Sequence, residues 1–315
     1  MRRRAASGEH AFRQRMKPVT RADITWGRST VLAHLGCIRY RDVLVLQGAP
    51  LFGAFYALDH LGVDAVSRLA VFVVASALLV AHIFSLNDWA GVGADGNDPN
   101  KVANVFLNRG ITPRSIGILS VTLLGTSLPL FALLGWRTLV LAVGIAALGL
   151  VYSHPALDAK GTPLVSSVPH VLGGLLHFLL GYSLFGPVDG RGVLIAVYFT
   201  LTFAAGHLNQ EVRDYDGDRL NGIRTNAVRF GRTPVFVASL VVFTFAYAHL
   251  GFLAVSGRVP AAQAVVLLLY PVHMFWSLRA LRSGLTFEAV TRLRDRYRAL
   301  YALIGLIVLA TLLFR

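Results

Sequence analysis

The sequence predicts an all-α integral membrane protein with about nine transmembrane helices. Hydrophobic residues fill 55% of its 315 positions and the mean hydropathy is +0.60, whereas an ordinary soluble domain is about 45–50% apolar. Apolar runs long enough to cross a bilayer recur along most of the chain. Basic residues are dense in alternate loops and sparse in the others, which is typical of a multi-pass membrane protein.

The chain begins with a basic arm. Residues 1–38 carry Arg at positions 2–4 and further scattered basic residues but no apolar run, so we predict no signal peptide and a cytoplasmic segment near anionic lipid. Residues 39–315 form the predicted membrane domain. Its expected spans, of which the fourth and ninth are short, are 41–60, 67–87, 114–135, 138–153, 165–186, 192–210, 234–256, 260–280 and 298–314.

The distribution of basic residues predicts the orientation. With nine spans and a cytoplasmic N-terminus, all but five of the 30 Lys and Arg residues fall on the cytoplasmic side, in agreement with the positive-inside rule. The five exceptions are Arg68, Arg137, Arg191, Arg258 and Arg315. The net charge of +14 therefore reflects topology, and we expect membrane lipid rather than nucleic acid as a partner.

An acidic segment follows the sixth apolar run. Residues 207–231 read HLNQEVRDYDGDRLNGIRTNAVRFG, and Asp214 and Asp218 lie on one helical face, about 40° apart. Two carboxylates one turn apart near the C-terminal end of a helix repel each other and oppose its dipole. A divalent cation would favour them, because Mg²⁺ prefers oxygen ligands and bridges carboxylates to phosphates. An acidic cap exposed to solvent is the alternative that this segment alone leaves open.

A second acidic segment ends the second apolar run. Residues 82–101 read HIFSLNDWAGVGADGNDPNK, in which Asn87, Gly91 and Asp95 share a helical face and Asp88 lies beside it. Together the two segments hold seven of the 16 acidic residues. Four predicted spans separate them, so both are expected at the cytoplasmic end of the bundle, where they can form one site.

These two segments resemble the paired aspartate motifs of the UbiA superfamily of intramembrane prenyltransferases. DYDGDRLNGIRTNAVRFG resembles the second motif and NDWAGVGAD the first, and the likeness extends over about residues 40–315. The resemblance implies a UbiA-like bundle whose active site opens to the cytoplasm. It also implies an Mg²⁺-dependent reaction on an isoprenoid diphosphate, for example geranylgeranyl diphosphate. The implied catalytic and metal-binding residues are Asn87, Asp88, Asp95, Asp214 and Asp218.

Gly91 is a departure from the transferase pattern. It stands where the first motif usually has a middle Asp, and the Asn-x3-Gly-x3-Asp form resembles the terpene cyclases of this superfamily. Cyclisation of the prenyl cation is therefore the expected reaction, with transfer to an aromatic or other lipophilic acceptor as the alternative. A transporter would place its ionisable residues near mid-membrane, and a scaffold has no use for two acidic clusters.

Further residues are expected to contact the substrate. By resemblance, Tyr152 and Lys160 in the loop after the fourth span approach the diphosphate. Lys101 and Arg224 flank the motifs and could neutralise phosphate oxygens, whereas Arg213 is expected to be a surface base that sets topology. Polar or aromatic side chains inside the spans could line the cavity for the prenyl cation; those selected are His177, Tyr198 and Phe203.

Overall fold

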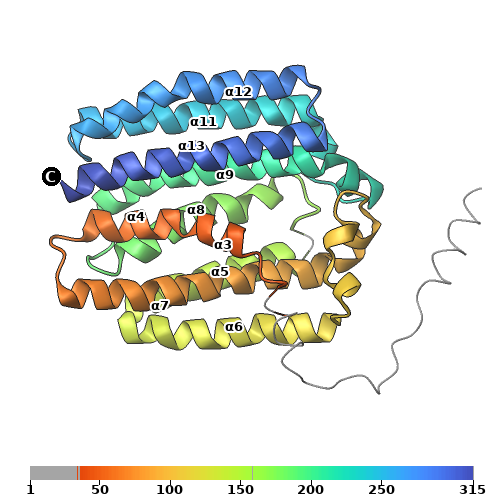
Figure 1. Cartoon of the computed structure of the whole chain (residues 1–315), viewed down its shortest axis with the longest axis horizontal. Coiled ribbons are helices and arrows are strands. Elements are labelled where there is room, and N and C mark those ends of the chain that lie inside the picture. Colours follow the sequence, from red (N-terminus) through yellow and green to blue (C-terminus); the bar gives the residue numbers. More distant parts are fainter. Residues whose placement is uncertain (1–33, 35, 158, 315) are drawn as a thin grey trace, which may run out of the picture. The chain divides into compact units, whose positions relative to one another are not determined.

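The computed structural model describes residues 34, 36–157 and 159–314. The chain divides into two units, residues 1–36 and 37–315. Nearly all of the predicted arm, residues 1–38, therefore lies outside the described residues. Every regular element that the structure describes in the second unit is a helix, and Figure 1 shows these helices running back and forth along one axis. The predicted all-α fold is confirmed.

The first predicted span consists of two short helices. Helix α3 covers Tyr40–Leu46 and α4 covers Gly48–Ala57. Pro50 in the first turn of α4 has no N–H to donate, and its ring would clash with the carbonyl group of Leu46 in a continuous helix. Neither piece alone is long enough to cross a bilayer.

The next three helices pack on one another. Helix α5 covers Val63–Asn97, α6 covers Pro113–Leu134 and α7 covers Trp136–Ser153. Between α5 and α6 lie two 3₁₀ turns, Val102–Asn104 and Phe106–Arg109. Large apolar side chains from α5, α6 and α7 meet in one buried cluster that includes Phe72, Leu79, Phe131 and Ile145.

Helices α8 and α9 lie beside α4 in the middle of the chain. The 3₁₀ turn η3, Val165–Ser167, leads into α8, Val168–Tyr182, and α9 covers Gly190–Leu220. Glycine permits these contacts. An added Cβ at Gly181 would overlap the Pro50 backbone of α4, and one at Gly174 would lie 2.8 Å from Phe203 Cβ of α9.

The C-terminal helices complete the bundle. They are α10, Asn226–Phe230; α11, Arg232–Val255; η4, Ala261–Leu269; α12, Tyr270–Arg282; and α13, Phe287–Leu313. In Figure 1 α11, α12, α13 and α9 run side by side. Two apolar clusters hold them together: one around Phe236, Phe243 and Tyr297, the other around Leu250, Leu253 and Ile304.

Eight helical segments within the described residues are long and apolar enough to cross a membrane. They coincide with the second to ninth predicted spans, although several extend further. Helix α5 continues to Asn97 rather than ending near residue 87, and α9 continues to Leu220 rather than residue 210. Both helices continue past their apolar runs because the polar residues at their ends form hydrogen bonds with neighbouring elements. Both acidic segments are therefore largely helical.

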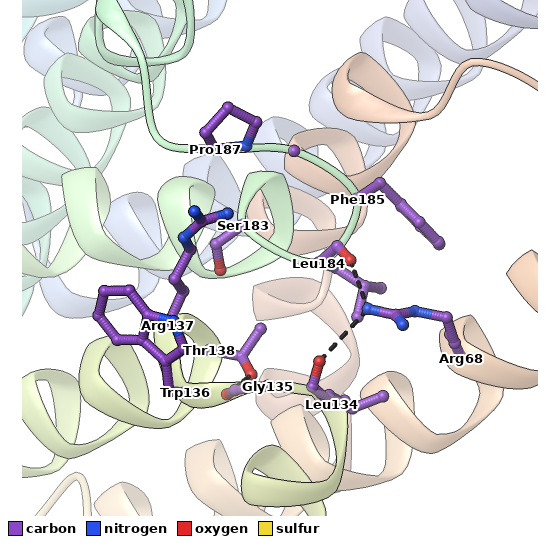
Figure 2. A pocket seen from close by; sticks show the side chains of 11 residues that line it. Arg68, Leu134, Gly135, Trp136, Arg137, Thr138, Ser183, Leu184, Phe185 and Pro187 are labelled. Atoms are coloured by element: carbon purple, nitrogen blue, oxygen red, sulfur yellow. Dashed lines mark hydrogen bonds between the residues drawn. The ribbon is translucent and has the colours of Figure 1, made fainter.

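The two ends of the bundle differ. The ends of α5, α9 and α12 and the starts of α6, α11 and α13 gather at one end, and the C-terminus of α13 lies at the other (Figure 1). At the C-terminal end of the bundle, a cavity of about 270 Å³ is lined by residues of α5, α6, α7 and the α8–α9 loop (Figure 2). Arg68 is one of the residues that line it, and its guanidinium donates to the carbonyl groups of Leu134 and Leu184 at 3.3 and 2.8 Å. This cavity is remote from both acidic segments.

Candidate active site

One face of α9 carries a continuous stripe of chemistry-bearing side chains. Phe203, His207, Glu211, Asp214 and Asp218 follow one another at intervals of three or four residues, so they share a face. The stripe passes from an aromatic ring inside the bundle to two carboxylates at its end. The predicted shared face of Asp214 and Asp218 thus belongs to one uninterrupted helix.

The end of α5 is joined to the end of α9 by side-chain hydrogen bonds. Asn221 donates to the Ala94 carbonyl oxygen at 3.0 Å and accepts from Asn97 at 3.1 Å. Gly217 leaves room for the carboxylate of Asp98, which is only 2% exposed and which an added Cβ at position 217 would overlap. The two acidic segments therefore meet, as their separation by four spans predicts.

Lys101 lies between carboxylates of both segments. Its ammonium group is 2.9 Å from Asp214 Oδ2, 3.5 Å from Asp95 Oδ1 and 4.0 Å from Asp98 Oδ2. Burial alone would lower the pKa of Lys101, but the carboxylates of Asp214 and Asp95 outweigh burial and raise that pKa above its ordinary value. The ammonium stays charged at neutral pH and offsets the repulsion between the two acids.

Asp214 has a second cationic partner. The guanidinium of Arg213 donates to both of its carboxylate oxygens, at 2.6 and 3.0 Å. The Arg213 side chain is only 16% exposed, so the expectation that it is a surface base is wrong. Asp216 points elsewhere, as the helical spacing predicts, and pairs with Arg232.

Asp218 has different surroundings. It is 5% exposed, and its carboxylate forms no hydrogen bond or ion pair with any residue that the structure describes. The charge of Lys160 attracts it electrostatically from beyond ion-pair distance. Tyr152 is close enough to interact electrostatically with Asp218, Asp214 and Glu211, and its ring edge meets His170 at 4.7 Å. Tyr152, in the last turn of α7, and Lys160, in the loop that follows, therefore both lie within electrostatic reach of Asp218.

Asn87 and Asp88, at the start of the first motif, have partners other than Lys101. Asn87 donates to Ser153 of α7 at 3.5 Å. Both carboxylate oxygens of Asp88 are engaged by Arg39, so Asp88 has its own counter-charge apart from Lys101. A Cβ at Gly91 would lie 3.7 Å from Asp95 Oδ2, at ordinary contact distance. Asp95 is therefore the residue of this motif that the structure brings to Asp214.

Of the remaining predicted residues, His177 and Phe203 contact each other, whereas Tyr198 and Arg224 lie apart from that pair. His177 of α8 stacks on Phe203 of α9 with ring centroids 5.8 Å apart, and its buried Nε2 has no partner among the described residues. Tyr198 lies five residues before Phe203, so the two side chains point about 140° apart around α9. Arg224 is exposed and forms no ion pair with the described part of the chain.

The donor set suits a hard divalent cation. Asp95, Asp214 and Asp218 supply carboxylate oxygens, the ligands that Mg²⁺ prefers, and the buried carboxylate of Asp218 lacks a partner among the described residues. No three His, Cys, Asp or Glu side chains in the described ranges are arranged as a finished metal site. Between Asp95 and Asp214 the positive charge is supplied by Lys101. The residue types fit the cation, and Lys101 is the group that would have to turn away.

Sequence reasoning missed several residues that build this site. Asp98 and Gly217 pack against each other although they are far apart in the sequence. Glu211 accepts from Ser166 at 2.9 Å and Asn226 at 3.2 Å, which ties α9 to the elements on either side of it. Four acidic residues within eight positions were a signal for Glu211, but nothing in the local pattern identified its partners.

Known proteins are similar to this chain in sequence and in fold. Residues 48–289 match the UbiA prenyltransferase family. The chain is 31% identical over 211 residues to the digeranylgeranylglyceryl phosphate synthase of Natronomonas pharaonis, covering 64% of this chain and 70% of the relative.

Two solved structures are similar. A UbiA homologue from Archaeoglobus fulgidus bound to GPP and Mg²⁺ has a TM-score of 0.68 at 16% identity, over 89% of this chain and 99% of that one. The apo structure of a UbiA homologue from Aeropyrum pernix K1 has a TM-score of 0.69 at 17% identity, over 88% and 98%. The family match covers most of the chain, and the helical bundle and the meeting of the two aspartate motifs agree with it. This chain therefore belongs to the UbiA prenyltransferase family.

Proposed function

We propose that this protein transfers a prenyl group from an isoprenoid diphosphate to a lipophilic acceptor within the membrane. The observation that carries the proposal is the meeting of Asp95 and Asp214 on the ammonium of Lys101. Near them lies Asp218, whose carboxylate has no ion-pair partner among the described residues. Carboxylates and cations of both motifs thus surround one place at the end of an apolar bundle. A diphosphate can lie there while its hydrocarbon tail lies among the helices.

The cationic side chains would bind the diphosphate oxygens. Lys101 pairs with a carboxylate and could turn to a phosphate, whereas Lys160 lies within electrostatic reach of Asp218. Tyr152 is within electrostatic reach of Asp214, Asp218 and Glu211. Asp95, Asp214 and Asp218 would hold Mg²⁺, with Asn87 and Asp88 as the less directly placed candidates. When bound, that ion neutralises the diphosphate as it leaves with the electron pair of the C–O bond.

Aromatic side chains that lie further inside the bundle than the carboxylates would contact the prenyl tail. The rings of His177 and Phe203 stack across the α8–α9 contact on the side where the stripe of α9 turns apolar. Aromatic faces attract cationic carbon through their quadrupole, and the apolar surroundings limit premature capture by water.

The relative from Natronomonas pharaonis supports intermolecular transfer over cyclisation. It is named for a product, digeranylgeranylglyceryl phosphate, which carries two geranylgeranyl groups on one glyceryl phosphate. A second prenyl group joined to a glyceryl lipid requires an acceptor. We therefore propose a prenyl chain of about that size and an acceptor that enters from the lipid phase.

The test uses purified full-length protein with Mg²⁺ and geranylgeranyl diphosphate, with and without geranylgeranylglyceryl phosphate or a lipophilic phenol. Donor consumption should be slow until an acceptor is added, and the product should carry an intact linear prenyl group by mass spectrometry. A cyclic hydrocarbon or alcohol formed from the donor alone would instead establish cyclisation.

Cyclisation stays the second candidate because of Gly91, and one substitution separates the two reactions. Gly91→Asp adds a carboxylate beside Asp95, where the 3.7 Å Cβ contact leaves room for it. In a transferase, we expect turnover to stay within about threefold of wild type or to rise, an effect below about 1 kcal/mol in barrier. In a cyclase, the same change should reduce product formation by repositioning the diphosphate. Acceptor-dependent turnover that survives Gly91→Asp would remove the cyclase interpretation.

A further inference from the structure

A buried carboxylate next to the site has one occupied and one bare oxygen. Glu211 is 4% exposed. Its Oε1 accepts from Ser166 Oγ at 2.9 Å and Asn226 Nδ2 at 3.2 Å. His207 Nε2 lies 3.1 Å from the same oxygen and interacts with it electrostatically. Its Oε2 is buried and has no partner among the residues that the structure describes.

A bare buried carboxylate oxygen is costly and calls for an explanation. The contacts of Oε1 do not explain Oε2: Ser166, Asn226 and His207 all approach Oε1, and a neutral side chain could accept from the first two equally well. The arrangement instead fixes the orientation of the carboxylate through Oε1 and leaves Oε2 for another group. Such a fixed orientation is what a proton acceptor in catalysis requires.

The position of Glu211 on α9 fits that role. It lies one turn inward from Asp214 on the shared stripe, a rise of about 4.5 Å. If the diphosphate lies at Asp214 and Asp218, the reacting carbon of the prenyl chain lies inward of them, level with Glu211. The stacked rings of His170 and His207, with centroids 3.7 Å apart, lie beside it.

We infer that Glu211 is the general base that removes the proton from a hydroxyl group of the acceptor. This inference rests on the proposed transfer reaction. The C1–O bond of the donor breaks and its electron pair leaves on the diphosphate. A lone pair of the acceptor oxygen forms the new C1–O bond, and the acceptor O–H bond breaks as its proton passes to Glu211 Oε2. Ser166 and Asn226 act as positioning residues through Oε1.

Glu211→Gln tests the inference, since glutamine keeps the size and one acceptor oxygen but is not a base. Binding of a non-ionisable thiolo analogue of geranylgeranyl diphosphate, measured by calorimetry, should stay within about twofold of wild type. Transfer to geranylgeranylglyceryl phosphate should fall by about a hundredfold or more, which is the usual contribution of a general base. Glu211→Asp should retain part of the activity because it keeps a carboxylate.

A second readout separates a base from a merely structural residue. An acceptor analogue whose hydroxyl is acidified by neighbouring fluorine needs less help to lose its proton, so the Glu211→Gln defect should shrink by about tenfold. Asn209→Ala is the matched control: Asn209 is buried, lies two residues away on another face of α9 and also lacks partners among the described residues. That variant should respond to both acceptors as wild type does.

Each contrary outcome has its own meaning. Near wild-type transfer by Glu211→Gln would overturn the inference and make the diphosphate the proton acceptor. An equal loss with both acceptors, or a loss of analogue binding, would reduce Glu211 to a structural role. Failure of wild type to transfer the prenyl group to either acceptor while it consumes the donor would overturn the proposed transfer itself.

Discussion

The two ends of the helical bundle use positive charge in different ways. At the end where the acidic segments meet, Lys101 and Arg213 pair with carboxylates that would otherwise repel one another. At the opposite end, Arg68 donates to the carbonyl oxygens of Leu134 and Leu184 and ties the α6–α7 corner to the α8–α9 loop (Figure 2).

The comparison separates residues that serve chemistry from residues that serve stability. Carbonyl groups at helix ends need donors in any membrane protein, so the contacts of Arg68 require no functional explanation. Carboxylates that lie close together repel one another and lower stability, so their presence does require a functional explanation. Substitutions at the acidic end should therefore change turnover, and those at the other end should change the unfolding temperature.

The largest effect is expected at Asp218. Asp218→Asn removes a charge that has no cationic partner within 4 Å among the described residues, so the fold should be preserved. Prenyl transfer should fall by about a thousandfold, because a lost metal ligand costs several kcal/mol of transition-state stabilisation. Asp214→Asn should lose turnover to a similar extent, but it also leaves Lys101 and Arg213 without this carboxylate and should lower stability. Product formation under limiting Mg²⁺ measures the effect, and EDTA should silence the wild type. Near wild-type turnover by either variant would refute these ligand assignments.

A smaller loss is expected from crowding the junction of the two motifs. In Gly217→Ala, the new Cβ would overlap the carboxylate of Asp98 and push α5 and α9 apart. Misplacement by about 1 Å can reduce turnover about a hundredfold, and we expect a loss between tenfold and that value. Gly93→Ala is the matched control, because no atom lies within 4 Å of its added Cβ. Equal activity of the two variants would show that the Asp98 contact is dispensable.

The smallest change in turnover is expected at the opposite end. Arg68→Met removes both carbonyl hydrogen bonds and should lower stability by about 1–3 kcal/mol, seen as a lower melting temperature in detergent. Prenyl transfer at ambient temperature should stay within about twofold of wild type. Arg137→Met provides the comparison, because Arg137 is exposed and forms no ion pair with the described residues. A selective loss of turnover in Arg68→Met would show that the two ends are coupled.

Local periodicity accounts for what the sequence predicted correctly. Hydrophobic runs located the helices, and four-residue spacing placed Asp214 and Asp218 on one face. The approach of Asp214 to Asp95 around Lys101 followed from counting spans. The sidedness of the membrane and the predicted role of each site residue stay predictions.

Long-range packing accounts for what was missed. The extension of α5 and α9 past their apolar runs depends on contacts such as Asn97 with Asn221, 124 residues apart. Arg213 was misjudged because its burial is a property of the bundle rather than of its neighbours in sequence. The bond between Glu211 and Ser166 spans 45 residues, so no local window contains it.

The positive charge of Lys101 affects which cations can bind to the carboxylates at the acidic end. A carboxylate cluster without its own cation would attract any small cation from the surrounding salt. The ammonium of Lys101 already neutralises much of that field, so a monovalent ion that arrives alone gains little. Under the proposed function, Asp95 and Asp214 would hold a divalent cation that arrives with a diphosphate, and the ammonium of Lys101 would then donate to the phosphate oxygens instead of the carboxylates. Donor binding would then be an exchange of counterions, in which Lys101 disfavours the binding of monovalent salt.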